Sequence, residues 1–254
     1  MIYIAAHKEF EVPSLQGYIP LQVGAEGKKS FGYLRDNEGE EISAKNPNFC
    51  ELTGLYWIWK NTQDEQVGLV HYRRYFGKSN FSADPKDIYS YDEMKEMLKD
   101  VDIILPYTAY FLQNAKEEIL VECCTEEIFD QLRECVLRLY PDYIQDFDRF
   151  FAANQSSLFN MMFCRRAQFD AYCQWLFDIL FELEKYVDLE KLNDYQKRLF
   201  GFLSERLLNI WVMHHHLRVR HVAVVNIGMP LNTRIIIMRR RLTNRIRYRL
   251  KGQK

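Results

Sequence analysis

The chain has 254 residues, of which 48% are hydrophobic and 27% charged, and this predicts one globular domain with a sizeable core. Its net charge is −1, but nine of the 34 Lys and Arg residues and none of the 35 acidic residues follow position 233. A basic tail on an acidic body argues for a surface anchor and against a nucleic-acid-binding domain. No apolar run approaches the roughly 18 residues of a membrane span.

The six cysteines form no C-x-x-C pair, and two of them, Cys123 and Cys124, are adjacent. Residues 2–6 form a strand-like apolar run directly after Met1, so no signal peptide is expected before them. We therefore expect reduced thiols in a cytosolic protein.

The first predicted element is a buried strand over residues 2–6, an apolar run that ends before His7 and Lys8. Ligands of open α/β sheets bind at the carboxyl ends of strands. His7 and Lys8 are therefore candidate ligand contacts, with Lys8 suited to a phosphate, and a solvated loop is the alternative. Residues 13–48 are rich in Pro and Gly and predict a long irregular connection, which in a compact domain is usually functional.

A helix is predicted over residues 48–61, after the segment Asn46-Pro47. Asn48 is a favourable N-cap, and Glu51 stands three residues later, as in a capping box. This pattern favours a structural role for both side chains.

Residues 67–70 predict a second buried strand, and its exit carries His71-Tyr72-Arg73-Arg74. Strand alternation would place His71 and Arg73 on one side and Tyr72 and Arg74 on the other. Two consecutive arginines can neutralise a diphosphate without a metal. His71 could donate to a phosphate, ligate a metal or act as a base. The alternative is an ordinary basic loop.

The second half of the chain is predicted to be rich in helices, interspersed with short strands. Strands alternating with helices predict an α/β sheet. The expected helices cover residues 91–99, 116–151 with a break near Pro141, 169–186 and 195–213, and the expected strands cover 101–105 and 219–227. An apolar segment covers 159–164, and a helix-like basic segment begins at 235.

Two motifs that resemble metal sites have simpler interpretations. Asp100-Val101-Asp102 precedes its strand, so it lies at the wrong end for a ligand and predicts a helix-to-strand turn. Consecutive residues of a helix point about 100° apart, so His214 to His216 cannot all ligate one ion and are expected to form a polar helix end. The sequence has no P-loop and no Gly-x-Gly-x-x-Gly motif.

Glu205 lies inside an apolar helical stretch, between Leu203 and Leu207. A carboxylate in such surroundings is either paired with a cation, such as Arg206, or serves as a general base. The sequence leaves these two alternatives open.

Several blocks of the sequence, in order, resemble a bacterial family first catalogued as a domain of unknown function. Its members are described as capsular-polysaccharide, exopolysaccharide or lipopolysaccharide glycosyltransferases and include galactofuranosyltransferases. The resemblance covers roughly residues 2–225. The blocks are Ile2 to Lys8, Tyr18 to Ala25, Ile42-Ser43 with Lys45-Asn46, Glu51 to Asn61, His71 to Tyr75, Asn160, Tyr172-Cys173 with Trp175 to Phe177, and Gly201-Phe202 with Glu205 to Leu207.

The resemblance implies a GT-A-like, Rossmann-like nucleotide-binding fold, with one glycosyltransferase domain over residues 1–233 and a basic tail over 234–254. It implies transfer of a hexose, such as galactose or galactofuranose, from a nucleotide-diphosphate donor, with UDP as the expected nucleotide. The implied acceptor is a lipid-linked glycan of capsule or lipopolysaccharide synthesis, and no nucleic acid is involved. Such an enzyme would be cytoplasmic and peripheral on the inner face of the plasma membrane, where the basic tail meets anionic lipid at about 1 kcal/mol per cation.

The resemblance also places the His71–Arg74 block in the active site. No well-placed Asp-x-Asp supports a bound Mn²⁺ or Mg²⁺, so no metal ligand is predicted. Two alternatives stay open, namely a non-catalytic nucleotide-sugar or glycan-binding component of an assembly complex, and a phosphotransferase or nucleotidyltransferase acting on sugar phosphates. The candidate residues are His7, Lys8, Gln22, Tyr72, Arg73 and Arg74 for the donor, His71 and Glu205 for catalysis, and Asn160 for the acceptor.

Overall fold

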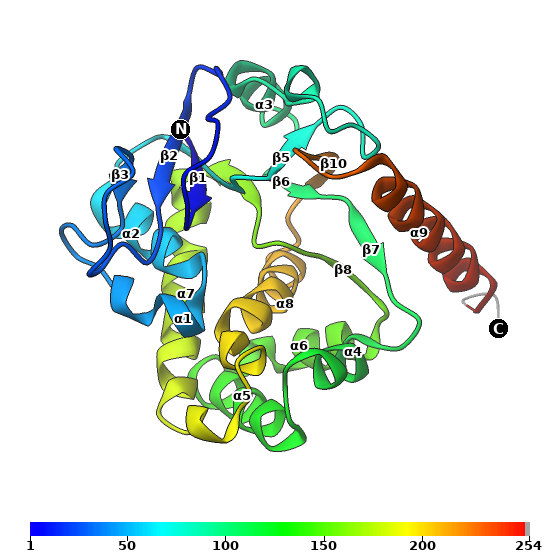
Figure 1. Ribbon diagram of the computed structural model, residues 1–254. Coiled ribbons are helices and arrows are strands. Elements are labelled where there is room, and N and C mark those ends of the chain that lie inside the picture. The colour runs from blue at the N-terminus through cyan, green and yellow to red at the C-terminus, as the bar shows by residue number, and fades with distance from the viewer. Residues whose placement is uncertain (252–254) are drawn as a thin grey trace.

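A mixed β-sheet with helices on both faces forms the centre of the computed structural model, which describes residues 1–251 (Figure 1). The strand order is β3-β2-β1-β4-β5-β10-β6-β9, and β9 also pairs with β4. β2, β1 and β4 are parallel neighbours. The strands of this sheet are β1 (Ile2–Ala6), β2 (Tyr18–Gln22), β3 (Leu34–Arg35), β4 (Gln66–His71), β5 (Arg74–Gly77), β6 (Ile103–Pro106), β9 (Met162–Arg165) and β10 (Val219–Asn226). A separate antiparallel ribbon pairs β7 (Thr108–Tyr110) with β8 (Gln155–Ser157).

Most of the helices that follow β7 in the chain lie together below the sheet in Figure 1. The α-helices are α1 (Asn46–Phe49), α2 (Leu52–Asn61), α3 (Tyr91–Met97), α4 (Ala115–Glu122), α5 (Glu126–Leu139), α6 (Ile144–Ala152), α7 (Arg166–Glu184), α8 (Leu199–His214) and α9 (Leu231–Lys251). Short 3₁₀ turns span Ser43–Lys45, Pro85–Asp87, Pro141–Tyr143, Leu189–Lys191 and Gln196–Arg198.

Apolar side chains of β1 enter two different cores, because successive residues of a strand point to opposite faces. Tyr3 and Ala5 join the larger core, whereas Ile2 and Ile4 join the smaller one. Such burial on both faces is typical of central parallel strands. β1 and its parallel neighbour β4 therefore form a rigid support for whatever follows their carboxyl ends.

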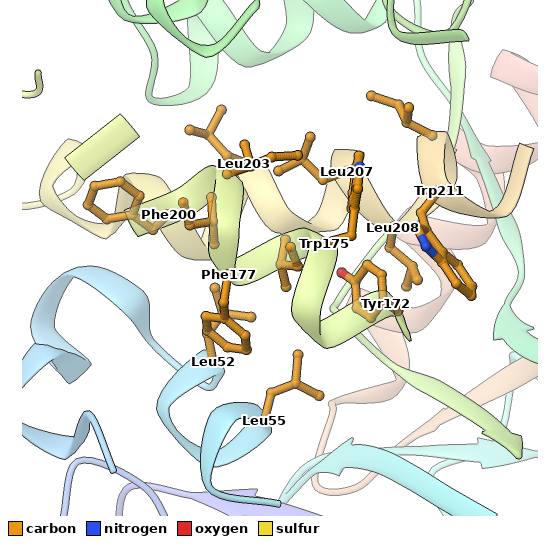
Figure 2. Close-up of a cluster of buried hydrophobic side chains, with 14 of the residues drawn as sticks. Leu52, Leu55, Tyr172, Trp175, Phe177, Phe200, Leu203, Leu207, Leu208 and Trp211 are labelled. Atoms are coloured by element: carbon orange, nitrogen blue, oxygen red, sulfur yellow. The ribbon is translucent and has the colours of Figure 1, made fainter. Parts of the chain in front are cut away.

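The larger core joins α2, α7 and α8 (Figure 2). Each fully buried large apolar side chain contributes about 1.5–3 kcal/mol to stability, so this cluster fixes α8, which carries Glu205, against the rest of the fold. The labelled members are Leu52 and Leu55 of α2, Tyr172, Trp175 and Phe177 of α7, and Phe200, Leu203, Leu207, Leu208 and Trp211 of α8.

The prediction of an irregular connection over residues 13–48 is wrong where β2 and β3 form. Pro20 obscured β2, because proline is rare inside a strand. In the structure Pro20 pairs with Ile4 of β1, whereas β3 reaches only Leu21 and Gln22 on the other side. Pro20 therefore lies where one side of the strand has no partner, a position that tolerates a missing N–H.

The predicted helix over residues 48–61 is broken into α1 and α2 at Cys50, whose φ is 53°. The predicted N-cap at Asn48 is wrong, because Asn48 lies inside α1 and its side chain donates to the carbonyl of Lys197 (2.9 Å). Glu51 precedes α2, but its side chain makes no capping hydrogen bond. The Glu51 carboxylate is therefore available for another purpose.

The block at the exit of β4 is a tight hairpin and not a continuing strand. Tyr72 and Arg73 form the turn, and His71 lies directly opposite Arg74 in the antiparallel pair. Residues opposite each other in such a pair project to the same face, so the predicted separation of His71 from Arg74 is wrong. The hairpin brings these two side chains together.

The remaining predicted helices and strands are confirmed, with bounds that differ by a few residues. The break near Pro141 is a 3₁₀ turn, and residues 123–125 add a second break between α4 and α5. The basic tail is a helix, α9, that contacts β7, where Asn244 donates to the carbonyl of Tyr110 (2.8 Å). Lys254, counted in the basic tail, lies outside the described residues. Within residues 1–251, no helix is long and apolar enough to cross a membrane.

Candidate active site

A cavity of about 720 Å³ opens at the carboxyl ends of β1 and β4. Parallel strands present these ends at one edge of the sheet, which is where α/β folds bind ligands. Loops, α1, α4 and α8 complete the wall. The charged and polar lining residues are His7, Asn46, Glu51, His71, Tyr72, Arg73, Arg74, Glu122, Tyr195, Arg198 and Glu205.

One part of the lining is cationic. The Arg73 guanidinium lies 4.9 Å from the centre of the Tyr72 ring, and the His7 ring lies 5.2 Å from the same ring. Burial lowers the pKa of His7, and the neighbouring cations, including Lys8, Arg73 and Arg198, lower it further. Burial and the nearby cations therefore both disfavour a charged imidazole, and the positive potential of these cations attracts an anionic ligand.

The two other cavity arginines also contact uncharged groups. Arg74 lies 4.7 Å from the centre of the Phe159 ring, and Arg198 donates from Nε to the Cys50 sulfur (3.5 Å). Within the described chain, neither they nor Arg73 form an ion pair with a carboxylate, unlike Arg206 behind them. Their hydrogen-bonding edges remain available for phosphate oxygens, which guanidinium groups bind in a bidentate manner.

Glu205 faces the cavity from α8 with 15% of its side chain exposed. Burial raises its pKa to about 7, and the nearby carboxylates of Glu51 and Glu122 act in the same direction. Arg206 opposes this rise from 3.1 Å, but it shares its guanidinium with Glu122 at 2.5 Å. The structure therefore combines the two alternatives left open by the sequence, because Glu205 is ion-paired and also poised to exchange a proton near neutral pH.

His71 is held in one tautomer. Its Nε2 lies 2.5 Å from the Phe159 carbonyl oxygen, and since a carbonyl only accepts, Nε2 must carry the proton. Burial lowers the pKa of His71, which favours the neutral ring. Nδ1 of neutral His71 therefore carries a free lone pair, as a base or an acceptor for a substrate hydroxyl requires.

The segment Phe159-Asn160 connects the two predicted catalytic groups. The Phe159 carbonyl binds His71, and the Phe159 backbone lies near enough to Glu205 to lower the pKa of that carboxyl group. Phe159 and Asn160 both have left-handed φ values, 78° and 51°, and such conformations cost about 1–3 kcal/mol each and concentrate at functional sites. The strain is held in place by the side chain of Asn160.

Asn160 is 1% exposed and lies behind the cavity. Its Nδ2 donates to Glu51 (2.8 Å) and to the carbonyl of Gly201 (3.0 Å), and its Oδ1 accepts from Ser204 (2.9 Å). All of its polar atoms are thus used inside the protein. The structure places Asn160 as a positioning residue that joins α8 to Glu51, and does not place it among the cavity-lining residues of the predicted site.

Two other predicted donor contacts lie away from the lining. Gln22 is fully buried, and its amide binds the backbone of Lys29 (2.9 Å) and Phe31 (3.2 Å), so it holds the loop after β2. Lys8 is exposed and lies near the cavity, with Nζ 5.6 Å from the centre of the Tyr72 ring. The structure brings together the other candidates, namely His7, His71, Tyr72, Arg73, Arg74 and Glu205.

Sequence reasoning missed Glu51, Glu122 and Arg198 as cavity residues. Arg198 meets Cys50 across 148 positions of the chain, a proximity that no local pattern reveals. Glu51 offered one signal, because it opens one of the blocks of the family resemblance, but its helical position favoured a capping role.

The Asp100–Asp102 triplet and the run His214 to His216, both interpreted as structural, have structural roles. The carboxylate of Asp102 accepts hydrogen bonds from the backbone N–H and the guanidinium of Arg218 at donor–acceptor distances of 2.9–3.1 Å. These bonds anchor the amino end of β6. A second Asp-x-Asp triplet, Asp146-Phe147-Asp148, lies in α6 and pairs with His214 (3.0 Å) and Arg133 (2.7 Å).

The histidine run forms the polar end of α8, where His215 bonds the Tyr143 hydroxyl (2.8 Å). In residues 1–251 no three His, Cys, Asp or Glu side chains gather as metal ligands do. All six cysteines are free thiols.

Two comparisons with known proteins find similar sequences and folds. The model of a family described as a domain of unknown function (DUF4422) matches residues 1–216. The apo structure of WbbM, a bifunctional glycosyltransferase, superposes with a TM-score of 0.82 and 27% identity. The match covers 90% of this chain and 45% of that chain, so this chain corresponds to less than half of the larger protein. No curated protein sequence matches. The predicted mixed α/β fold with a helix-rich second half is confirmed.

Proposed function

This chain belongs to the DUF4422 family, and from that premise we propose that it is a glycosyltransferase acting at the cavity that Glu205 faces. The similarity to part of a bifunctional glycosyltransferase supports glycosyl transfer as the reaction. The observation that carries the proposal is one cavity that joins a carboxyl group with a pKa of about 7 to a group of arginines without carboxylate partners among the described residues.

The reaction removes a proton from the acceptor hydroxyl and places negative charge on the departing diphosphate. The cavity has side chains suited to each of these two changes. The oxygen of an acceptor hydroxyl forms a bond to the anomeric carbon as the bond from that carbon to the diphosphate oxygen breaks. The hydroxyl proton passes to the Glu205 carboxylate, with His71 as the second candidate base, and such a base contributes about 10²–10⁴-fold. The negative charge on the departing nucleotide diphosphate is stabilised by Arg73, Arg74 and Arg198.

The donor is proposed to be a UDP-linked hexose, with galactose or galactofuranose as the first candidates to test. The cavity volume of about 720 Å³ lies within the usual range for small-molecule sites, roughly 300–1,000 Å³. The rings of His7 and Tyr72 flank the arginines and offer surfaces on which a base or a sugar can stack. The arginines take the place that a divalent metal has in many related sites, so we propose transfer without Mn²⁺ or Mg²⁺.

The acceptor is proposed to be a lipid-linked glycan of capsule or lipopolysaccharide synthesis, approached from the cytoplasmic face of the membrane. Supporting this, α9 carries eight Lys and Arg residues between Leu231 and Lys251 and no acidic residue. Such a helix is attracted to anionic lipid. The enzyme would then be peripheral, with its active site close to the membrane surface.

Thermal shift and nucleotide release, measured with UDP, GDP, CMP and dTDP sugars with and without Mn²⁺, test this function. We expect stabilisation by UDP sugars and slow release of free UDP in the absence of metal. Stabilisation by a sugar nucleotide without release, even with lipid-linked acceptors present, would instead support a non-catalytic binding component.

A further inference from the structure

A second cavity, of about 510 Å³, lies between β7 and α9. Its wall combines aromatic, apolar and cationic side chains. These side chains include Tyr107, Tyr110, Met238, Arg241, Leu242 and Arg245.

Arg241 is only partly exposed, and its guanidinium lies 3.2 Å from the centre of the Tyr107 ring. Arg245, one helical turn further along α9, lines the same cavity. Neither arginine has a carboxylate partner among the residues that the structure describes, and burial lowers the pKa of Arg241. A cation withdrawn from water without a partner is costly, so the partly buried Arg241, with the exposed Arg245 beside it, is suited to an anionic ligand.

An exposed apolar stripe adjoins the two arginines. Leu231, Ile235, Met238, Leu242 and Ile246 follow one another at intervals of three or four residues, so they share one line along α9. Leu242 is 61% exposed and Ile246 is 49% exposed. Because Met238 and Leu242 also line the cavity, the stripe continues directly from the anion-binding end. A ligand that satisfies both parts must be an amphiphile with an anionic head.

The second cavity lies beside the candidate active site. Tyr107 lines the second cavity and Phe159 lines the first, and their ring centres are 6.3 Å apart. Arg74 contacts the Phe159 ring from one cavity and Arg241 contacts the Tyr107 ring from the other. These two rings therefore lie side by side between the two cavities, which makes the cavities neighbours.

We propose that Arg241 and Arg245 bind the phosphate of a lipid phosphate whose hydrocarbon chain lies along the apolar stripe of α9. The binding site itself rests on the second cavity alone. Its role rests on the proposed function, because a glycan attached to that phosphate would extend past Tyr107 and Phe159 toward Glu205. The site would then hold the acceptor by its lipid end and leave its glycan end free to react.

Titration calorimetry of the full chain with farnesyl phosphate tests the site, with inorganic phosphate and farnesol as the two half-ligands. We expect farnesyl phosphate to bind at least tenfold more tightly than either. The double variant Arg241→Gln/Arg245→Gln should lose at least tenfold in affinity. The matched control Arg240→Gln/Arg247→Gln removes the same charge from exposed positions of α9 outside the cavity and should stay within twofold of wild type.

A second pair of variants tests the apolar part without changing charge. Leu242→Asn should weaken farnesyl phosphate several-fold, whereas Ile236→Asn, at an equally exposed position off the stripe, should not. Equal losses in both arginine doubles, equal affinity for inorganic phosphate, or no binding of farnesyl phosphate to a folded wild-type chain would each overturn the proposal. UDP affinity, measured on the same proteins, should be unchanged, so failure of the lipid site and failure of the proposed transferase give different results.

Discussion

Two cation-lined cavities meet at the contact between Tyr107 and Phe159, and they differ in their carboxylates. The first cavity sets Glu51, Glu122 and Glu205 against its arginines. Among the described residues, none that lines the second carries a carboxylate. Arginines alone can hold an anion, but a transfer reaction also needs a group that takes a proton, so the comparison assigns chemistry to the first cavity and binding to the second.

The largest effect is expected from Glu205→Gln. Removing the base should lower kcat by about 10²–10⁴-fold, while UDP affinity stays within a few-fold of wild type, because the arginines that bind the diphosphate remain. Glu126→Gln, at an exposed acid on α5 that pairs with Lys116, is the control and should keep full activity. A Glu205→Gln enzyme with wild-type kcat would remove the chemical difference between the cavities.

Arg73→Ala should lower kcat/KM by about 10²–10³-fold, because it removes a donor aimed at the developing charge of the leaving group. Lys78 directly follows β5 and is an exposed cation that pairs with Glu93 of α3. Lys78→Ala is the control and should leave kcat/KM unchanged. EDTA should not affect the wild-type rate. If chelation abolishes turnover, the arginines do not replace a metal.

Asn160→Ala should lower the free energy of unfolding by about 1–3 kcal/mol and the rate by roughly tenfold. The substitution removes buried hydrogen bonds to the Gly201 carbonyl and from the Ser204 hydroxyl, and it frees Glu51 from its position. Chemical denaturation and kinetics on one protein preparation measure both effects. A rate loss without any loss of stability would instead support direct contact between Asn160 and the acceptor.

The value of kcat/KM should rise as the pH rises through about 7, because Glu205 must be ionised to accept a proton and its pKa is about 7. Activity is therefore lost as pH falls below that value. Glu51→Gln removes one of the charges that raise the pKa of Glu205, so it should move this rising limb to lower pH. An unmoved limb would mean that another group controls the profile.

The smallest effect concerns the outer side of α9. Each of Arg239→Gln, Arg240→Gln and Arg247→Gln should weaken binding to phosphatidylglycerol vesicles about fivefold, which corresponds to about 1 kcal/mol per cation. Release of UDP in solution should not change, because these exposed residues line neither cavity. Vesicle sedimentation measures the first quantity. Unchanged sedimentation would argue against α9 as the membrane contact.

Sequence periodicity predicted the sheet and most helices because apolar patterns at helical spacing, such as those of α5 and α6, reflect a single buried face. The exit of β4 was also predictable, since a cationic block follows an apolar strand. The hairpin at Tyr72-Arg73 was not, because a two-residue turn without glycine carries no strong signal. Glu51 and Arg198 reach the cavity only through tertiary packing, which also gives Glu205 its raised pKa.

The most direct test of the central claim is UDP release from a UDP-linked hexose by the wild type and by Glu205→Gln, with UDP affinity measured on both proteins. We predict that both proteins bind UDP with similar affinity in the presence of EDTA. Only the wild type should release UDP from the sugar nucleotide at a measurable rate. Equal rates of release, or UDP binding that requires a divalent metal in both proteins, would contradict the assignment of a metal-independent transferase to this cavity.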